Sequence, residues 1–331
     1  MFYPLRFNQN HFTLVWGSED WTVSAVPQKE SVVADGAFAG RTLGQLVEEY
    51  GERLLGKKVA KMYGRRFPLL VKFIDARDDL SIQVHPDNAL AMQRHGSLGK
   101  TEMWFVMDAE PGAHLYSGFN QTISKYEYQK RIEDGTICEV LQRHEVKQGD
   151  VFFIPAGRVH AICGGIRLAE VQQNCDITYR IFDYNRPGLD GRPRQLHTAE
   201  AADAIDFRMY PTYRTDYLDR INDPVAITQC PYFTVKILNI TRSFHRKLFK
   251  YDSFIIYICL HGNCKIHTRK TSQPLFSSIP QSDIYPGSTI QLCEGQSCLI
   301  PAAIADIDLI PDNESGLTEL IEVYIDNKHF N

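Results

Sequence analysis

Hydrophobic residues follow a helical period in only a few segments, all in the first half of the chain. The clearest segment begins at Thr42 and carries its apolar residues on one helical face: Leu43, Leu46, Val47, Tyr50 and Leu54. Thr42 and Gln45 have the spacing of a capping box, which predicts the start of this helix. The polar positions between the apolar ones indicate a helix with one wet face.

Two further helices are predicted from their end signals. One runs from Pro86 to about Arg94, because proline suits the first helical turn and Gly96 supplies a stop. The other starts at Ser124, has Glu127 three residues later, and ends near Gly135.

Short runs rich in β-branched and aromatic residues surround these helices and predict strands. From about Tyr232 onward the helical period almost disappears, and short strands recur at even spacing, as in a sandwich or barrel. The fold class we predict is therefore mainly β, with helical insertions in the N-terminal half. The clearest predicted strands of that half are Val71 to Ile74, Met103 to Met107, Val151 to Ile154, Ile166 to Val171 and Ile177 to Phe182.

A weak internal repeat relates the two halves. GDVFFIPAGRVHAI, from Gly149 to Ile162, aligns with GQSCLIPAAIADIDL, from Gly295 to Leu309, through a shared Gly-x5-Pro. The second copy has no histidine where the first has His160; alternation puts Asp306 there, with Ala305 or Asp308 nearby. We predict two related β domains, at residues 1–231 and 232–331, of which only the first retains a site.

Composition narrows the class of protein. The 331 residues are 44% hydrophobic, enough for two cores, and 36 Lys plus Arg balance 40 Asp plus Glu without long single-sign blocks. These features disfavour a nucleic-acid partner. The start of the chain resembles no export signal, and the longest apolar run, Phe254 to Leu260, is too short to span a bilayer. We expect a soluble, cytoplasmic protein with no membrane partner.

Eight cysteines are too few for a disulfide scaffold in a chain of this length. Cys259 with Cys264, and Cys293 with Cys298, form two Cys-x4-Cys pairs that could hold a structural zinc. The first pair closes the strand-like run FIIYIC, so buried, reduced thiols in strands explain the spacing more simply.

Candidate chemistry gathers in three segments. The pattern Gly149-x5-Pro155-x-Gly157-x2-His160 resembles the second signature of the cupin superfamily, in which a turn presents a histidine to the mouth of a small barrel. In SIQVHPDNA, residues Gln83 and His85 lie two apart and share one face of a strand, which Ser81 joins. In GKTEMWFV, Lys100 and Glu102 share a face in the same way.

Gln83, His85, Glu102 and His160 together supply nitrogen and oxygen ligands that suit a divalent first-row metal. An open coordination position for water or substrate would make this a catalytic metal. No Gly-rich nucleotide-binding loop is present in the sequence.

The strings SIQVHPD, GKTEMWFV, GDVFFIPAGRVHAI and EVQQNCDITYRIFDYNR, in this order, closely resemble the type I mannose-6-phosphate isomerase family over roughly residues 67–187. The likeness is weaker at WGSEDW and only architectural over the last hundred residues. The chain resembles the shorter bacterial members, which lack a large helical domain. The resemblance implies a double cupin, one zinc ion per chain held by His85, Glu102 and His160 with Gln83 as a fourth ligand, and a catalytic arginine at Arg180.

The implied reaction is an aldose–ketose isomerisation of mannose 6-phosphate and fructose 6-phosphate through an enediolate. Ser81 and Lys100 are the candidates for holding the phosphate, and Glu170 and Gln172 for supporting the ligands from behind. The base stays open between a metal-bound hydroxide, Glu170 and a nearby histidine.

Two other functions fit parts of the pattern. A cupin oxygenase would use two histidines and a carboxylate to bind iron. The basic residues Lys100 and Arg180, together with the hydroxyl of Ser81, favour a phosphorylated substrate instead. A non-catalytic sugar-binding cupin would need no complete ligand set. The sequence specifies neither the oligomeric state nor the breadth of substrates.

Overall fold

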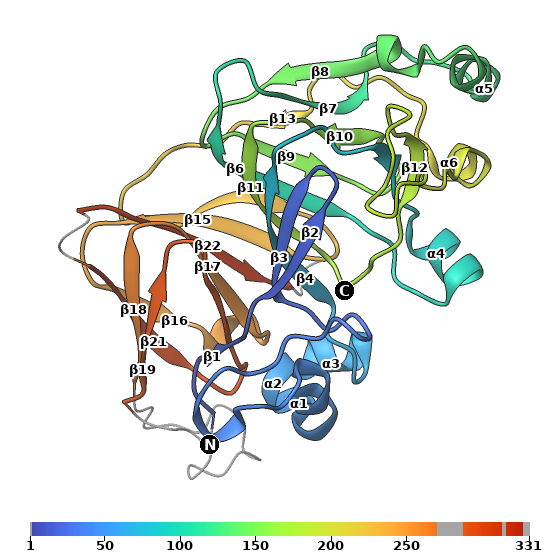
Figure 1. Ribbon diagram of the computed structural model, residues 1–331. Coiled ribbons are helices and arrows are strands. Elements are labelled where there is room, and N and C mark those ends of the chain that lie inside the picture. The colour runs from blue at the N-terminus through green and yellow to red at the C-terminus, as the bar shows by residue number, and fades with distance from the viewer. Residues whose placement is uncertain (1, 270–286, 313–315, 327–331) are drawn as a thin grey trace. The chain divides into compact units, whose positions relative to one another are not determined.

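The computed structural model describes residues 2–269, 287–312 and 316–326 and is mainly β, as predicted (Figure 1). The chain forms two compact units, each assembled from separate segments. Unit 1 comprises Met1–Asn10, Thr22–Pro68 and Asp216–Asn331, and unit 2 comprises His11–Trp21 and Leu69–Thr215. The predicted boundary at residue 231 divides the chain into two continuous stretches. The units seen here are instead assembled from separate segments, and the predicted boundary stays a prediction.

Unit 2 is built around two antiparallel sheets. One has the order β12-β5-β10-β7-β8, and the other has the order β13-β9-β6-β11-β4-β3-β2. The strands of the first sheet are β5 (Ile82–Val84), β7 (His114–Phe119), β8 (Leu141–Glu145), β10 (His160–Ile162) and β12 (Tyr179–Phe182). Those of the second are β2 (Asn10–Leu14), β3 (Gly17–Val23), β4 (Leu69–Ala76), β6 (Glu102–Ala109), β9 (Val151–Ile154), β11 (Ile166–Gln173) and β13 (Arg214–Thr215).

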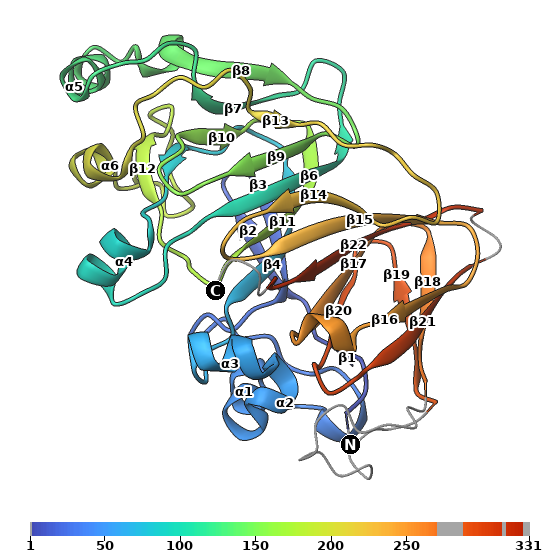
Figure 2. The same ribbon diagram turned by 180° about the vertical axis from the view of Figure 1, so that it is seen from behind.

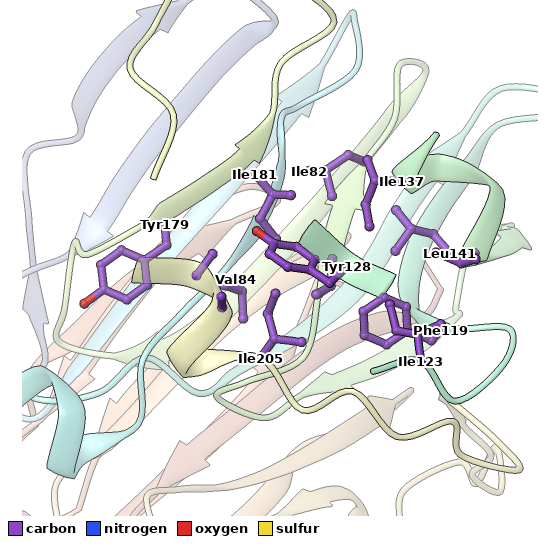
Figure 3. Close-up of a cluster of buried hydrophobic side chains, with 14 of the residues drawn as sticks. Ile82, Val84, Phe119, Ile123, Tyr128, Ile137, Leu141, Tyr179, Ile181 and Ile205 are labelled. Atoms are coloured by element: carbon purple, nitrogen blue, oxygen red, sulfur yellow. The ribbon is translucent and has the colours of Figure 1, made fainter. Parts of the chain in front are cut away.

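The outer face of the five-stranded sheet is covered by helices α5 (Lys125–Glu133) and α6 (Thr198–Ala204). Alternate residues of β5, β10 and β12 point to this side and pack against the helices. Figure 3 shows the resulting apolar cluster, in which Ile82, Val84 and Ile181 of the strands face Tyr128 and Ile205. Because successive strand residues point to opposite faces, the residues between them point into the space between the two sheets.

Unit 1 also contains two sheets, ordered β1-β20-β17-β22-β15-β14 and β16-β21-β18-β19. Figure 2 shows these strands from behind. The first sheet contains β1 (Leu5–Arg6), β14 (Val225–Gln229), β15 (Thr234–Ile240), β17 (Ile255–His261), β20 (Ser297–Ile300) and β22 (Thr318–Tyr324). The second contains β16 (Phe244–Lys247), β18 (Asn263–Thr268), β19 (Thr289–Cys293) and β21 (Asp306–Pro311).

The strand orders confirm the internal repeat. The run β9-β6-β11-β4 in unit 2 has the same topology as β20-β17-β22-β15 in unit 1, and β5-β10-β7-β8 has the same topology as β16-β21-β18-β19. Each unit is thus a two-sheet β-barrel or sandwich, so the predicted fold class, a double cupin with few helices, is confirmed.

The capping signals placed three helices well. The Thr42 and Gln45 capping box opens α1 (Leu43–Tyr50), which Gly51 separates from α2 (Glu52–Leu55). Ser124 caps α5 as expected. The helix α4 (Asn88–His95) begins two residues later than predicted, because Asp87 rather than Pro86 supplies the cap, and Gly96 ends it in the left-handed conformation. The helix α3 (Lys57–Tyr63) was not predicted.

Candidate metal centre

The centre lies between the two sheets of unit 2 and draws its first two residues from the strand β5. Gln83 lies within this strand and His85 directly follows it. Both belong to the inward-facing set, because Ile82 and Val84 point to the helix-covered face. His85 is fully buried, at 1% exposure.

His160 enters the centre from the neighbouring strand and lies directly opposite Gln83. The turn before β10 requires Gly157, whose φ is +88° and whose missing Cβ would lie 2.9 Å from the Ala204 carbonyl oxygen. The Gly157 N–H also donates a hydrogen bond to the His85 carbonyl, at 2.9 Å. This single turn therefore ties together the segments that carry the two histidines.

The carboxylate comes from the facing sheet. Glu102 begins β6 and lies opposite Ile154 on β9 and Gln172 on β11. Its side chain is 1% exposed and projects across the space between the sheets, so that Oε1 lies 3.2 Å from His85 Nε2 and Oε2 lies 3.7 Å from His160 Nε2.

His85, Glu102 and His160 form a buried group whose ligand atoms all lie within 4.8 Å of one another, close enough for one ion to contact all three. Among the residues that the structure describes, this is the only such group of histidine, cysteine and carboxylate side chains. The two Cys-x4-Cys pairs do not form one, in agreement with the expectation of free thiols, and Cys259, Cys264 and Cys298 are buried.

The donor set fits a divalent metal on two observations. Both histidines are held through Nδ1, that of His85 against the Ile177 carbonyl at 2.9 Å and that of His160 against the Arg158 carbonyl at 2.8 Å, which leaves each Nε2 aimed at Glu102. Both carboxylate oxygens of Glu102 are buried; Oε1 is paired with the Lys100 ammonium at 2.8 Å, and Oε2 has no hydrogen-bond partner. A metal cation would satisfy Oε2.

Gln83 lies beside the group, but its amide nitrogen and not its amide oxygen is directed toward His160. Its Nε2 lies 3.3 Å from His160 Nε2, and its Oε1 accepts a hydrogen bond from Ser81 Oγ at 3.4 Å. The amide oxygen would be the metal ligand, so Gln83 could join the set only after its amide turns over.

The pKa shifts of the three residues favour the protonation states that bind a metal cation, namely two neutral imidazoles and one carboxylate. Burial and the nearby Lys100 charge lower the pKa of His85 to about 3, and burial lowers the pKa of His160, so both imidazoles are neutral donors. Burial alone would raise the pKa of Glu102, but Lys100 and His85 outweigh it and hold this pKa well below the usual range. Glu102 is therefore a carboxylate at neutral pH.

Lys100 is part of the same cluster. It is 4% exposed, and its Nζ lies 2.8 Å from Glu102 Oε1 and 3.1 Å from His85 Nε2. Its charge balances Glu102, because the Glu102 and Glu170 carboxyl groups outweigh burial and raise the pKa of Lys100. Ser81, the other residue predicted to hold phosphate, is also buried.

The two residues predicted to support the ligands lie on β11 in the facing sheet. Gln172, opposite Glu102, donates from Nε2 to the carbonyl oxygens of Gln173 and Cys175, at 2.9 and 2.7 Å. Glu170 lies one inward position further along, where burial and then the Glu102 charge raise its pKa to about 7. No hydrogen bond or ion pair joins either residue to a histidine ligand in the described part of the chain.

Arg180 faces the same space from β12. It lies opposite Gln83, and therefore in one row with His160 across three strands. Its Nη1 donates to the Gln195 carbonyl at 2.8 Å, whereas its buried Nε has no partner. Burial and then Arg194 lower the pKa of this guanidinium, which still leaves it a cation.

Three further side chains with polar atoms point inward from the sheets and were not predicted from the sequence. Lys72 on β4 is 3% exposed and lies opposite Glu170, with their charged atoms 3.7 Å apart. Trp104 on β6 and Ser117 on β7 are buried, and their Nε1 and Oγ atoms have no hydrogen-bond partner. Lys72 could have been identified from the sequence, because a lysine interrupts the apolar run LLVKFI. Trp104 and Ser117 can be recognised as inward-facing only from the strand register.

The repeat in unit 1 replaces the ligands with aliphatic side chains. Pairing of β16 with β21 sets Ile307 opposite Arg246, as pairing of β5 with β10 sets His160 opposite Gln83. Ile255 pairs with the residue before Pro301, as Glu102 pairs with the residue before Pro155. The expectation that Asp306 or a neighbour stands at the histidine position is therefore corrected to Ile307. The connections 155–159 and 301–305 have equal length, but β21 begins one residue before Ile307, whereas β10 begins at His160 itself.

Residues 17–111 match the family model described as phosphomannose isomerase type I, catalytic domain. The chain is 40% identical to mannose-6-phosphate isomerase ManA of Bacillus subtilis over 228 residues, which cover 68% of this chain and 70% of that protein. It is 38% identical to the mannose-6-phosphate isomerase of Streptococcus mutans, over 66% of this chain and 67% of that protein.

Solved structures of phosphomannose isomerases align with nearly the whole chain. The mannose 6-phosphate isomerase structure from Bacillus subtilis aligns with a TM-score of 0.82 and 29% identity, covering 97% of this chain and 99% of that one. A variant of phosphomannose isomerase from Salmonella typhimurium shares the fold, with a TM-score of 0.70 at 15% identity and coverage of 98% and 100%. No described helix is long and apolar enough to cross a membrane.

Proposed function

The chain belongs to the type I phosphomannose isomerase family, and on that premise we propose that it interconverts mannose 6-phosphate and fructose 6-phosphate at the buried His–Glu–His group of unit 2. The reaction is an intramolecular oxidoreduction, which moves one proton between C1 and C2 and shifts the carbonyl between them. No redox cofactor is consumed.

The metal that we propose is one zinc ion per chain, held by His85, Glu102 and His160, with Gln83 as the fourth ligand after its amide turns. Imidazole and carboxylate donors in a group of this size suit zinc. When bound, zinc supplies a Lewis acid that polarises the carbonyl and the adjacent hydroxyl of the sugar.

Arg180 is the proposed catalytic arginine. Its position opposite Gln83, in the same row across the strands as His160, supports this role. Negative charge develops on the two oxygens of the enediolate, and a guanidinium stabilises that charge without giving up its own proton.

Ser81 and Lys100 are the proposed phosphate-binding residues. Both are buried beside the ligands, and a phosphate held by Lys100 would compete with Glu102 for its ammonium group. For the proton transfer, Glu170 is a candidate base, since its Oε1 is buried without a hydrogen bond, with Lys72 Nζ 3.7 Å away, and its pKa of about 7 matches a group that both accepts and returns a proton near neutrality. Gln172 would support Glu102 from behind.

The two alternative functions are disfavoured. A cupin oxygenase or a non-catalytic sugar-binding cupin would need relatives of that kind, whereas the relatives named above are mannose-6-phosphate isomerases. The complete buried ligand group also argues against a purely binding role.

The observation that carries the proposal is the buried group of two neutral imidazoles and one carboxylate, whose ligand atoms all lie within 4.8 Å of one another. The test is a coupled assay for fructose 6-phosphate after addition of mannose 6-phosphate to the purified, zinc-loaded chain. Turnover by the wild type that Glu102→Gln abolishes supports the proposal, and a wild type without turnover would refute it.

A further inference from the structure

The internal repeat allows the two units to be compared within one molecule. The strand orders show which strands correspond, and the pairing register shows which residues correspond. Trp104 lies opposite Glu170 in unit 2, and Tyr257 lies opposite Glu322 in unit 1. The inward side chains of the two units can therefore be compared pair by pair.

The same register relates two hydroxyl residues. Ser117 on β7 lies opposite His160, and Thr268 on β18 lies opposite Ile307. Since Ile307 has the position of His160, Thr268 has the position of Ser117. Both side chains are fully buried, at 0% exposure.

The unit 1 counterparts of Trp104, Glu170 and Ser117 have hydrogen-bond partners within the protein, although Thr234 Oγ1, Asn239 Oδ1 and Ser297 Oγ of the same unit are buried without one. The Glu322 carboxylate accepts hydrogen bonds from Arg246 Nε at 2.8 Å and from Tyr257 OH at 2.7 Å. The Thr268 hydroxyl lies 2.9 Å from Ser288 Oγ. Unit 1 has aliphatic residues at the ligand positions, and these bonds satisfy the polar atoms of Glu322, Tyr257 and Thr268.

Their counterparts in unit 2 have free polar atoms. Glu170 Oε1, Trp104 Nε1 and Ser117 Oγ are all buried, and none has a hydrogen-bond partner in the described chain. A buried hydroxyl without a partner costs free energy, and in native proteins such groups call for a partner from outside the fold. The free atoms in unit 2 occupy the positions whose equivalents are satisfied where no metal ligands exist.

Ser117 is the most informative of the three, because its surroundings hold the backbone and leave the side chain free. His144 Nε2 lies 3.2 Å from the Ser117 carbonyl oxygen and fixes the strand there. Directly opposite residues of an antiparallel pair point to the same side, so Ser117 Oγ stands next to the His160 side chain.

We propose that Ser117 is a substrate-binding residue whose Oγ forms a hydrogen bond with a hydroxyl group of the sugar phosphate beside His160. This inference rests on the proposed isomerase function and adds a contact that no sequence motif indicates. The hydroxyl can donate to or accept from a sugar oxygen, and no proton is transferred to it.

The test compares Ser117→Ala with wild type, measuring kcat/KM for mannose 6-phosphate and the melting temperature of the zinc-loaded chain. We expect kcat/KM to fall roughly 10-fold, mainly through KM, as is typical for the loss of one substrate hydrogen bond. The melting temperature should stay the same or rise, because the variant removes an unpartnered buried hydroxyl.

Thr268→Val is the matched control. It removes the equivalent hydroxyl where that hydroxyl has a partner, so it should lower the melting temperature and leave kcat/KM unchanged. Ser117→Ala with kcat/KM within twofold of wild type would overturn the inference while the isomerase function stands. A lower melting temperature for Ser117→Ala would also overturn it, by assigning the hydroxyl a structural partner. A wild type without turnover would overturn both proposals.

Discussion

His85 Nε2 and Glu102 Oε1 lie 3.2 Å apart in a site where each side chain is 1% exposed, although the two residues belong to different sheets. A neutral imidazole and a carboxylate gain little from each other at this separation. A cation between them would gain from both, which makes this pair the centre of the proposed metal site.

Replacing a ligand should remove the metal and the activity together. Glu102→Gln keeps the size of the side chain but removes its charge, so we expect zinc affinity to fall by more than the roughly 10- to 100-fold lost when a residue that supports a ligand is replaced. Turnover should fall at least about 100-fold. Elemental analysis and the coupled assay on the same samples check this. Full zinc content in Glu102→Gln would contradict the assigned ligand.

Arg180 should separate chemistry from metal binding. Arg180→Ala removes the proposed catalytic cation, whose guanidinium donates to the Gln195 carbonyl and to none of His85, Glu102 or His160, so zinc content should remain at the wild-type level while kcat falls by about 10²–10³. Arg180→Lys should recover only part of this loss, since a point charge cannot reproduce the planar guanidinium. An unchanged kcat in Arg180→Ala would remove this residue from the mechanism.

Lys100 forms an ion pair with Glu102 and is proposed to hold the phosphate, and kinetics can test the second role. If it holds the phosphate, Lys100→Ala raises KM by about 10-fold or more, since a charge-assisted hydrogen bond contributes about 1.5–3 kcal/mol. Circular dichroism and zinc content of the variant guard against a disturbed site, because Lys100 Nζ lies 2.8 Å from Glu102 Oε1. An unchanged KM would refute the phosphate role.

The second unit should matter for stability and not for chemistry. Arg246→Met leaves the fully buried Glu322 carboxylate without its main partner, and loss of one member of such a pair costs about 3–5 kcal/mol of unfolding free energy. Combining it with Glu322→Leu should restore part of that loss. Urea unfolding measures both, and kcat/KM of the folded variants should match wild type. A specific loss of kcat/KM in Arg246→Met would give unit 1 a part in the reaction.

Much of the site was predictable because its ligands sit in short motifs. The spacing of Gln83 and His85, and the turn before His160, fix which side chains share a strand face. The strand Val151–Ile154 was predicted with its observed bounds, since a continuous apolar run ends at Pro155. Motif spacing did not reveal how Glu102 reaches the histidines, because that depends on how two sheets face each other.

The rest depended on register between distant strands. Ser117 joins the site only through its pairing with His160, more than forty positions further along the chain, and nothing in HLYSGF marks it as inward and unpartnered. An ungapped alignment assigned Asp306 to the histidine position, whereas the pairing of β21 with β16 puts Ile307, one residue later, opposite Arg246. A one-residue shift exchanges the inward and outward faces of a strand, so this error changed an aliphatic residue into an apparent acid.

The most direct test follows turnover and bound metal in one titration. The purified chain is stripped with a chelator, zinc is added back stepwise, and the initial rate with mannose 6-phosphate is measured at each step, with iron and manganese as parallel series. The account predicts a rate that rises in proportion to bound zinc and levels off at one ion per chain. Stoichiometric zinc binding without turnover, or full turnover in the stripped chain, would contradict it.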